Sequence, residues 1–434
     1  MVKKIIPPMS ALTLTNYEQG MLNGEYGDAV AMCMRIVVGV ARANGAQQLI
    51  EIESAHADGC IYYGLAGLEF CEKLVSLGGR VKVRTTLNVG SLDLLHPGVV
   101  TGTPDFKALA HRLMNAHIAL GCEQTWSCAP YQTGHRPEFG SHVAWAESNA
   151  IAFVNSVLGA RTDRYGDFLD LAAAVTGRVP YAGLHLDQER KAVLVLDFSS
   201  ISNSLLSEDV AWAALGLILG TQAGTRVAAL VGLPGDLADG GVTEDRLKNL
   251  GATSASSGGV GLFHVVGVTP EALTLDEIVS PEAKYINIGI NDLRRARDQL
   301  SNSVGDQIQA ISLGTPHFSL SEFKSLAFEL GEGFKFANNI DFYISTSRGV
   351  LAQAQELGYV QVFIDAGGLI VTDTCTYVTP ILNPNIKTVM TNSGKWAWYA
   401  PGNLNVSVIF GSLHECVQSA FKGSVVRDEQ LWSR

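Results

Sequence analysis

The chain has 434 residues, of which 47% are hydrophobic and 17% are charged. This composition supplies enough apolar side chain for several buried cores, so it excludes a chain that is disordered throughout and predicts about two to four domains. The formal net charge is −11 and no run of Lys or Arg is present, which argues against binding to a nucleic-acid backbone.

The cysteines and the most apolar stretch bear on the compartment. Seven cysteines, an odd number, in a long chain whose first eight residues do not resemble an export signal indicate a reducing environment. The most apolar stretch, 209–232, is interrupted by Asp209, Gln222 and Arg226, so it falls short of the about 20 apolar residues that cross a membrane. We therefore expect a soluble, cytoplasmic protein without membrane contact.

Residues 1–183 alternate between helical and strand patterns. Thr15 and Glu18 have the spacing of a capping box, which predicts a short helix after Thr15. The other elements that the sequence predicts here are a helix over 27–43, a strand over 48–53, a helix over 65–77, a strand over 80–85, a helix over 105–120 and a helix over 141–157. Strands that alternate with helices favour a parallel sheet.

Residues 184–300 and 301–434 continue this alternation as two further units. The second unit has apolar strands over 191–198, 226–231 and 260–268. The third has a strand over 307–313, a helix from Ser319, a strand over 341–345, a helix over 348–357 and a strand over 360–364. We predict an α/β protein of three domains, 1–183, 184–300 and 301–434, with mostly parallel sheets flanked by helices. Polar side chains that could take part in catalysis or binding gather in loops of the first and third units, which predicts an interdomain active-site cleft between them.

Two cysteines lie in polar segments. Cys128 and Cys375 are surrounded by Thr, Ser and Pro, whereas Cys33, Cys71 and Cys416 lie in helical patterns and read as small buried hydrophobic residues. A thiol in a polar loop is typical of a metal ligand or a nucleophile. No Cys-x2-Cys pair or ferredoxin spacing is present, so spacing alone only weakly indicates cysteines from distant loops around a cluster with an open iron.

Other candidates have an ordinary alternative. Ser54, His56 and Asp58 lie together at the end of a predicted strand and are suited to bind or protonate a substrate. The alternative is a turn in which Asp58-Gly59 sets the backbone and His56 merely caps it. Glu147 falls in the apolar helix predicted over 141–157 and needs a partner, for which Arg161 or Arg164 are candidates; these arginines also suit a substrate carboxylate, or form surface ion pairs. The neutral donors that suit a carboxylate or hydroxyl substrate are the hydroxyl and amide groups of the segments 84–88 and 89–93, among them Thr85, Thr86 and Asn88.

The third unit adds three polar candidates. His317 and Ser319 follow the strand predicted over 307–313, and Ser319 with Glu322 also has the spacing of a capping box. Lys395 precedes a group of aromatic residues and lies at a cleft mouth or in solvent. No Walker A motif, dinucleotide-binding glycine pattern or Gly-x-Ser-x-Gly elbow is present in the right context, which disfavours nucleotide chemistry and an α/β-hydrolase.

Eight segments together resemble one known family. They are, in chain order, Ser54–Gly59, Thr85–Asn88, Thr125–Tyr131, Ala144–Ala150, Asn155–Arg164, Gly314–Ser319, Asp373–Cys375 and Asn392–Lys395. Their residues and their order are similar to aconitase X, a divergent branch of the aconitase superfamily, from about residue 10 to residue 410. The resemblance implies an aconitase-like architecture and an iron–sulfur hydro-lyase that dehydrates a hydroxy acid.

The resemblance also implies roles for particular residues. Cys128, Cys375 and a third cysteine, with Cys60 favoured over Cys122, would hold the cluster. The expected catalytic residues are His56, Glu147 and Lys395. The expected substrate-binding residues are Ser54, Thr85, Thr86, Asn88, Ser148, Asn149, Arg161, Arg164, His317 and Ser319.

Substrate and partner are expected from the same resemblance. The sequences Gly314–Ser319 and Asn88–Asp93 look like the bacterial branch, which acts on cis-3-hydroxy-L-proline, rather than the archaeal branch, which acts on mevalonate 5-phosphate. The chain resembles a large subunit that works with a small swivelling subunit. The alternatives are a mevalonate-5-phosphate dehydratase, a hydrolase or transferase with Cys128 as nucleophile beside His56 or His317, and a catalytically silent partner subunit.

Overall fold

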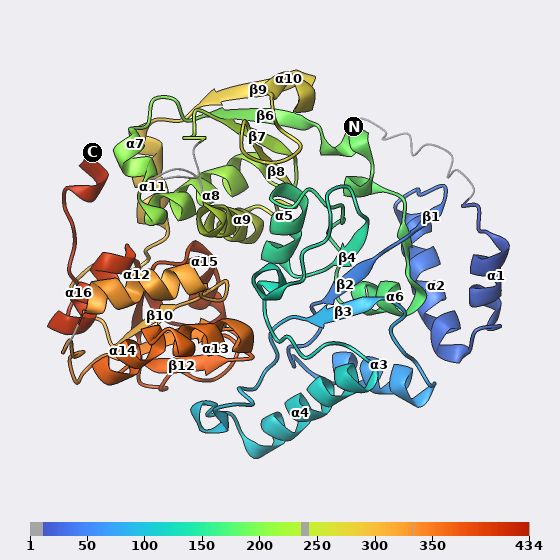
Figure 1. Ribbon diagram of the computed structural model, residues 1–434, viewed down its shortest axis with the longest axis horizontal. Helices are drawn as coiled ribbons and strands as arrows, with labels where there is room; N and C mark the ends of the chain where they lie inside the picture. The colour runs from blue at the N-terminus through green and yellow to red at the C-terminus, as the bar shows by residue number, and fades with distance from the viewer. Residues whose placement is uncertain (1–11, 236–242, 332, 434) are drawn as a thin grey trace, which may run out of the picture.

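The computed structural model describes residues 12–235, 243–331 and 333–433. In Figure 1 the first third of the chain, in blue to teal, lies beside the last third, in orange to red, with the green and yellow middle third above both. Helices α8 (Asp209–Ala223) and α9 (Glu244–Ser257) of the middle third pack against α15 (Gly394–Leu404), and α9 also packs against α5 (Ser148–Ser156). The three parts of the chain therefore meet at α9.

The first part contains a small parallel sheet with helices around it. Strands β3 (Arg84–Leu87), β2 (Ser54–Ala57) and β4 (Val143–Trp145) pair in that order and all run parallel. A separate antiparallel pair joins β1 (Leu49–Glu51) to β5 (Arg178–Pro180). The helices are α1 (Asn16–Asn23), α2 (Asp28–Ala43), α3 (Leu65–Ser76), α4 (Pro104–Ala119), α5 and α6 (Leu169–Thr176).

The middle part has one parallel sheet of order β8-β7-β6-β9. Its strands are β6 (Ala192–Asp197), β7 (Ala228–Val231), β8 (Phe263–Val265) and β9 (Val279–Asn287). Its other helices are α7 (Asn203–Leu206), α10 (Leu275–Ile278) and α11 (Ile290–Gln299). Helix α8, the most apolar stretch of the sequence, is buried among other elements, and no helix in the described ranges is long and apolar enough to cross a membrane.

The last part has a five-stranded parallel sheet of order β12-β11-β10-β13-β14. Its strands are β10 (Ala310–Leu313), β11 (Asp341–Thr346), β12 (Leu369–Thr372), β13 (Thr388–Thr391) and β14 (Ser407–Phe410). Its helices are α12 (Leu320–Leu330), α13 (Arg348–Glu356), α14 (Tyr359–Ala366), α15 and α16 (Leu413–Lys422). Mostly parallel sheets flanked by helices confirm the predicted fold class.

Several predicted elements have different bounds. The strand predicted over 48–53 is β1, and the chain continues directly into β2, so His56 lies on a strand and not in a loop. The strand predicted over 80–85 begins only at Arg84. The helix predicted over 141–157 is wrong in its first half, because Val143–Trp145 completes the sheet with β2 and the helix begins at Ser148.

The strand predicted over 360–364 is wrong. Residues Tyr359–Ala366 form α14, which buries Val360, Phe363 and Ala366. These positions are three apart, as on one face of a helix, and Gly358 and Gly367 at its two ends adopt the left-handed conformation. The β-branched and aromatic residues suggested a strand, but the glycines and the burial of one face decide for a helix.

Candidate active site

The loops that carry the candidate residues follow the carboxyl ends of parallel strands. Asp58 and Cys60 follow β2, Asn88 follows β3, and Glu147 follows β4. In the last part, the segment 314–319 follows β10, Cys375 follows β12 and Lys395 follows β13. Parallel strands bring their carboxyl ends to one edge of a sheet, where α/β proteins build their sites.

Two thiols from different parts of the chain meet at these edges. One ligand atom each of Cys128, His317 and Cys375 lies within 4.8 Å of the other two, and all three residues are buried. The backbone N–H of His317 donates to Cys128 Sγ at 3.2 Å. A hydrogen bond with Cys128, together with burial, raises the pKa of Cys375 well above its usual value. The predicted pairing of Cys128 with Cys375 is thus present as a close contact.

The imidazole of His317 is held by hydrogen bonds on both nitrogens. Nδ1 lies 3.1 Å from Ser127 Oγ, and Nε2 lies 3.3 Å from the carbonyl oxygen of Thr374. A carbonyl only accepts, so Nε2 carries the hydrogen and Nδ1 accepts from the serine. Burial lowers the pKa of His317 to about 4, so the ring is neutral near pH 7.

A buried ion pair joins the first and last parts beside the thiols. Lys395 Nζ binds Glu147 Oε1, and each side chain is 3% exposed. Burial alone would lower the pKa of Lys395, but the Glu147 carboxylate, together with Tyr377 and Cys128, outweighs burial and raises this pKa well above its usual value. The structure therefore gives Glu147 the partner Lys395, and not Arg161 or Arg164.

Glu147 lies at the N-terminal end of α5 and not inside a helix. Its Oε2 accepts from the backbone N–H of Ala150 at 2.7 Å and from Asn149 Nδ2 at 2.9 Å, which fixes the carboxylate. Asn149 Nδ2 also donates to the carbonyl of Cys128 at 2.6 Å, and Tyr131 Oη donates to Asn149 Oδ1 at 2.9 Å. Ser148 Oγ reaches both members of the ion pair, at 3.3 Å from Glu147 and 3.5 Å from Lys395.

His56 belongs to a buried polar chain behind the sheet edge. Its Nδ1 lies 2.9 Å from Thr86 Oγ1, which lies 2.7 Å from His135 Nδ1. In the described part of the chain, His56 Nε2 has no hydrogen-bond partner. Burial, and then His135, lower the pKa of His56 well below its usual value. Of the predicted neutral donors, Thr85 donates to the carbonyl of Val83 at 2.9 Å, and Ser54 is buried in β2.

Asp58 lies beside these candidates, although it is not among the site residues that the resemblance implies. Asn88 Nδ2 donates to its carboxyl, and the backbone N–H of Asp58 donates to Asp170 Oδ2 at 2.7 Å. Burial, and then the nearby Glu147 carboxylate, raise the pKa of Asp58 to about 8. Its place two residues after His56 at a strand end is the signal that makes it a candidate, with a turn at Asp58-Gly59 as the alternative.

Cys60 is not brought into the group of Cys128, His317 and Cys375. Its Sγ donates to the carbonyl of Ala57 at 3.5 Å, and the thiols that act on its pKa are Cys122 and Cys71. Burial, followed by Asp58, raises the pKa of Cys60 well above its usual value. The two candidates for the third cysteine, Cys60 and Cys122, thus lie near each other rather than beside Cys128.

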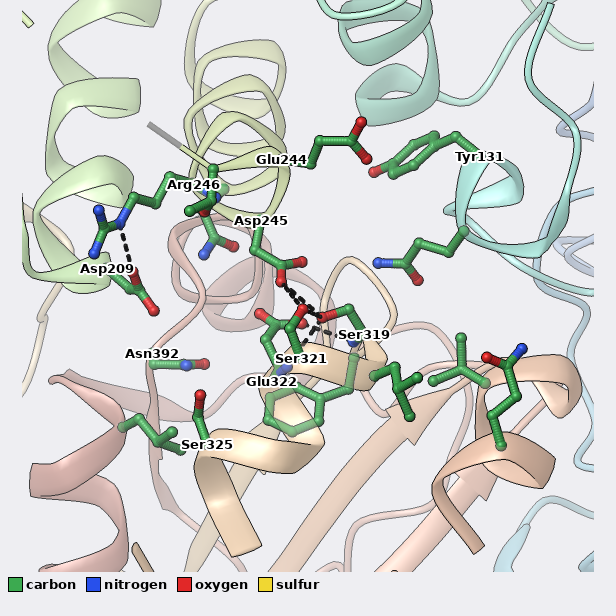
Figure 2. A pocket seen from close by; sticks show the side chains of 18 of the residues that line it. Tyr131, Asp209, Glu244, Asp245, Arg246, Ser319, Ser321, Glu322, Ser325 and Asn392 are labelled. Atoms are coloured by element: carbon green, nitrogen blue, oxygen red, sulfur yellow. Dashed lines mark hydrogen bonds and ion pairs between the residues drawn. The ribbon is translucent and has the colours of Figure 1, made fainter. Parts of the chain in front are cut away.

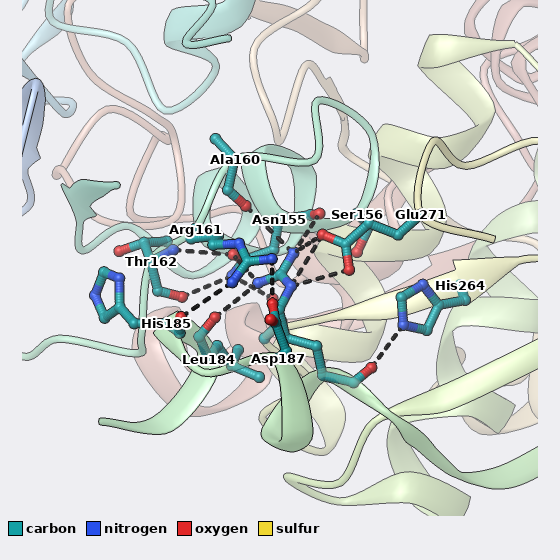
Figure 3. A network of polar contacts seen from close by, with 12 residues as sticks. Asn155, Ser156, Ala160, Arg161, Thr162, Leu184, His185, Asp187, His264 and Glu271 are labelled. Atoms are coloured by element: carbon teal, nitrogen blue, oxygen red, sulfur yellow. Dashed lines mark hydrogen bonds and ion pairs between the residues drawn. The ribbon is translucent and has the colours of Figure 1, made fainter. Parts of the chain in front are cut away.

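The two predicted arginines lie in other surroundings. Arg161 pairs with Asp187 at 2.5 Å and donates to the carbonyl of His185 at 3.2 Å, within the network of Figure 3. Arg164 donates to the carbonyl of Gly259 in the middle part. The structure therefore does not bring Arg161 or Arg164 to the thiols.

Ser319 confirms its alternative as a helix cap. Its Oγ accepts from the backbone N–H of Glu322 at 3.1 Å, and Glu322 Oε2 accepts from the backbone N–H of Ser319 at 2.8 Å. Ser319 Oγ also donates to Asp245 Oδ2 at 2.8 Å. Figure 2 shows these side chains at one wall of a cavity of about 560 Å³, which residues of the middle and last parts line together with Tyr131 of the first part.

The donor set beside Lys395 fits a transition metal. A tetrahedral ion holds sulfur at about 2.3 Å and nitrogen at about 2.0 Å, so its ligand atoms lie roughly 3–4 Å apart. Two thiols and an imidazole nitrogen, which all lie within 4.8 Å of one another, form a group that could hold one such ion. A backbone N–H directed at a ligand sulfur, as from His317 to Cys128, is also a feature that tunes iron–sulfur centres.

Comparisons with known proteins agree with this geometry. Three family models match in chain order: Aconitase X first domain over residues 11–188, second domain over 192–298 and third domain over 308–422. The cis-3-hydroxy-L-proline dehydratase of Pseudomonas aeruginosa is 39% identical over 419 residues, which cover 94% of this chain and 70% of that protein. The phosphomevalonate dehydratase large subunit of Methanocaldococcus jannaschii is 37% identical over 93% of this chain and 99% of that subunit.

A solved structure extends the likeness to three dimensions. The crystal structure of Thermococcus kodakaraensis aconitase X in its holo form superposes with a TM-score of 0.84 at 33% identity, covering 94% of this chain and 100% of that one. The relatives above are named as dehydratases, so the reaction class is that of a hydro-lyase. The matches to all three domain models show that the chain belongs to the aconitase X family.

Proposed function

We propose that the chain dehydrates cis-3-hydroxy-L-proline to Δ1-pyrroline-2-carboxylate. The α-proton and the 3-hydroxyl leave together as one molecule of water, and the resulting enamine tautomerises to the cyclic imine. The similarity to the Pseudomonas aeruginosa enzyme supports this substrate.

The charges beside the thiols are the observation that carries the choice of substrate. The Glu147 carboxylate and the Lys395 ammonium carry opposite charges, whereas Asp58, with its pKa raised to about 8, is neutral near pH 7. A zwitterionic amino acid suits these two charges, because the Glu147 carboxylate can bind its ring ammonium and Lys395 can bind its carboxylate. A phosphate dianion calls for several cations, whereas Lys395 supplies a single positive charge, which suits one carboxylate.

An iron–sulfur centre is the cofactor of this proposal. Cys128 and Cys375 would hold it, with His317 as the third side chain within reach and Cys60 as the predicted alternative. When bound, an open iron acts as a Lewis acid on the substrate hydroxyl. The seven cysteines are all free, which supports a reducing, cytoplasmic location.

The chain's own residues bind the substrate and move its proton. Glu147 is fixed by Ala150 and Asn149, so its free lone pairs keep one direction, and we assign it the removal of the α-proton. Lys395 orients Glu147 and binds the substrate carboxylate. We assign His56 and Asn88 a supporting role at the same sheet edge. In the described residues His56 Nε2 and Asn88 Oδ1 are buried and have no hydrogen-bond partner.

A small swivelling subunit is the proposed partner. The Pseudomonas aeruginosa relative is longer than this chain, and the Methanocaldococcus jannaschii relative is named as a large subunit. Both facts support an additional domain or chain that completes the site. We propose that full activity requires it.

The experiment combines cofactor loading with two substrates. The chain and its small partner are purified without oxygen, iron and sulfide are quantified, and cis-3-hydroxy-L-proline or mevalonate 5-phosphate is supplied. Formation of pyrroline-2-carboxylate supports the proposal. Turnover of mevalonate 5-phosphate alone would favour the second candidate, to which the 99% coverage of the archaeal large subunit points.

Cysteine variants test the ligand set. Cys128→Ala is expected to lose most of the bound iron, whereas Cys416→Ala, at an equally buried thiol in α16, is expected to keep it. His317→Ala and Cys60→Ala decide the third ligand by the same iron assay. Full iron in Cys128→Ala would refute the assignment. A chain that never binds iron but is alkylated at Cys128 would revive the cysteine-nucleophile hypothesis.

A further inference from the structure

The segment 314–319 lies where the three parts of the chain meet. It follows β10 of the last part and directs the N–H of His317 at Cys128 Sγ of the first part. On its other side it contacts α9 of the middle part. Whatever fixes this segment also fixes the hydrogen bond to Cys128.

Lys248 on α9 is the buried contact from the middle part. Its side chain is 1% exposed, and Nζ lies 3.4 Å from the carbonyl oxygen of His317. Nζ also pairs with Asp245 at 3.0 Å and with Glu322 of α12. A buried ammonium needs such partners, so its position is fixed by the two carboxylates and the carbonyl together.

The carboxylates that hold Lys248 also hold the segment itself. Glu322 accepts from the N–H of Ser319, and Asp245 accepts from the hydroxyl of Ser319. Figure 2 shows Asp245 facing Ser319 and Ser321 across the start of α12. One network of ion pairs and hydrogen bonds thus joins the N-termini of α9 and α12, and its member Lys248 contacts the carbonyl oxygen of His317.

We propose that Lys248 is a positioning residue, which holds segment 314–319 so that the His317 N–H reaches Cys128. Lys248 itself contacts neither thiol. No part of the proposed reaction requires a cation at this place. Its effect on catalysis therefore passes through the backbone of His317.

Hydrogen exchange of the segment tests the proposal directly. Lys248→Met keeps the length and apolar stem of the side chain and removes its charge. The full chain without added iron is compared with the variant, and a peptide that spans 314–322 is followed by mass spectrometry. We expect at least tenfold faster exchange there in Lys248→Met, because the His317 and Ser319 amides lose their fixed positions.

Arg190→Met is the matched control. Arg190 is 2% exposed and pairs with Glu271, away from the thiols. Its loss therefore removes a positive charge that is about as deeply buried as that of Lys248. We expect it to leave exchange over 314–322 unchanged. Unchanged exchange in Lys248→Met, or an equal rise in both variants, would overturn the proposal. If Lys248→Met does not fold, Glu322→Gln decides, since glutamine keeps the cap: faster exchange over 314–322 supports the proposal and unchanged exchange overturns it.

Kinetics with the small subunit and iron give a second readout, which rests on the proposed function. We expect Lys248→Met to lower kcat at least tenfold while KM changes less than about twofold. Wild-type kcat in a variant with faster exchange would refute the link to catalysis. A wild-type chain that turns over no hydroxyproline would refute the proposed function alone, because the exchange result does not depend on the substrate.

Discussion

The buried pair of Lys395 and Glu147 yields the sharpest prediction about stability and activity. Each side chain is 3% exposed, so Lys395→Met leaves a carboxylate buried without its cation. Breaking a buried ion pair in this way costs about 3–5 kcal/mol of unfolding free energy. We expect a loss of that size in urea unfolding of the single variant.

The double variant separates charge from packing. Glu147→Gln keeps an oxygen that can accept from the N–H of Ala150, so the start of α5 stays capped. Combined with Lys395→Met it removes both charges, and we expect it to lie within about 1–2 kcal/mol of wild type, since a neutral pair has no charge to desolvate. The coupling energy from the complete cycle should therefore exceed about 2 kcal/mol.

An exposed pair provides the control for this cycle. Arg84 and Glu123 are 44% and 46% exposed, and such surface pairs couple by roughly 0.2–1 kcal/mol. A coupling between Lys395 and Glu147 no larger than that between Arg84 and Glu123 would refute the reasoning from burial. The stable double variant should also be inactive, and wild-type kcat in it would refute the catalytic assignment of both residues.

Three further predictions rest on single contacts. Burial lowers the pKa of His185 to about 3, whereas the unfolded chain takes up this proton near pH 6.5, so the folded state loses stability as pH falls between these two values. The difference in unfolding free energy between wild type and His185→Asn, measured by urea unfolding, should therefore shrink by at most about 1.4 kcal/mol per pH unit from about pH 6.5 to about pH 3. A constant difference would contradict this. Gly314→Ala should lower the unfolding free energy by more than about 3 kcal/mol, because φ is 82° and a Cβ would lie 2.0 Å from the carbonyl oxygen of Ser345. Gly358→Ala, where φ is 78° and a Cβ would meet open space, should lower it by only about 1 kcal/mol. Equal losses in calorimetry would refute the role of the clash at Gly314. Tyr131→Phe removes a buried hydrogen bond and should cost about 1 kcal/mol in urea unfolding while lowering kcat; an unchanged kcat would exclude its hydroxyl from holding the site.

The elements that depend on neighbouring residues were predictable from the sequence. The capping boxes of Thr15 with Glu18 and Ser319 with Glu322 are both present, because each needs only residues three apart. The α/β class followed from helical and strand patterns of hydrophobic residues that alternate along the sequence. The failure at 360–364 has the same origin, since β-branched residues fit either element and only the packing of one face of α14 settles which forms.

Cys128 and Cys375, which the sequence singles out by their polar segments, lie together in the structure, and the family motifs indicated the reaction class. The partners within the site were not evident. Lys395 lies 248 residues after Glu147, and nothing local distinguishes it from the arginines that seemed equally suitable. The choice between a turn and a functional role for Asp58 stayed open in the sequence, because its burial among other carboxyls is invisible there.

The sequence by itself determined the local elements, the class of fold and the types of side chain available for chemistry, since these depend on residue identity and short spacings. Only the tertiary structure decided that Lys395 neutralises Glu147, that Cys128 meets Cys375 while Cys60 lies with Cys122, and that Lys248 reaches the carbonyl of His317. The reason is that parallel strands far apart in the chain bring their carboxyl ends to shared edges, and the packing of those edges, rather than any local signal, selects which charges and thiols become neighbours.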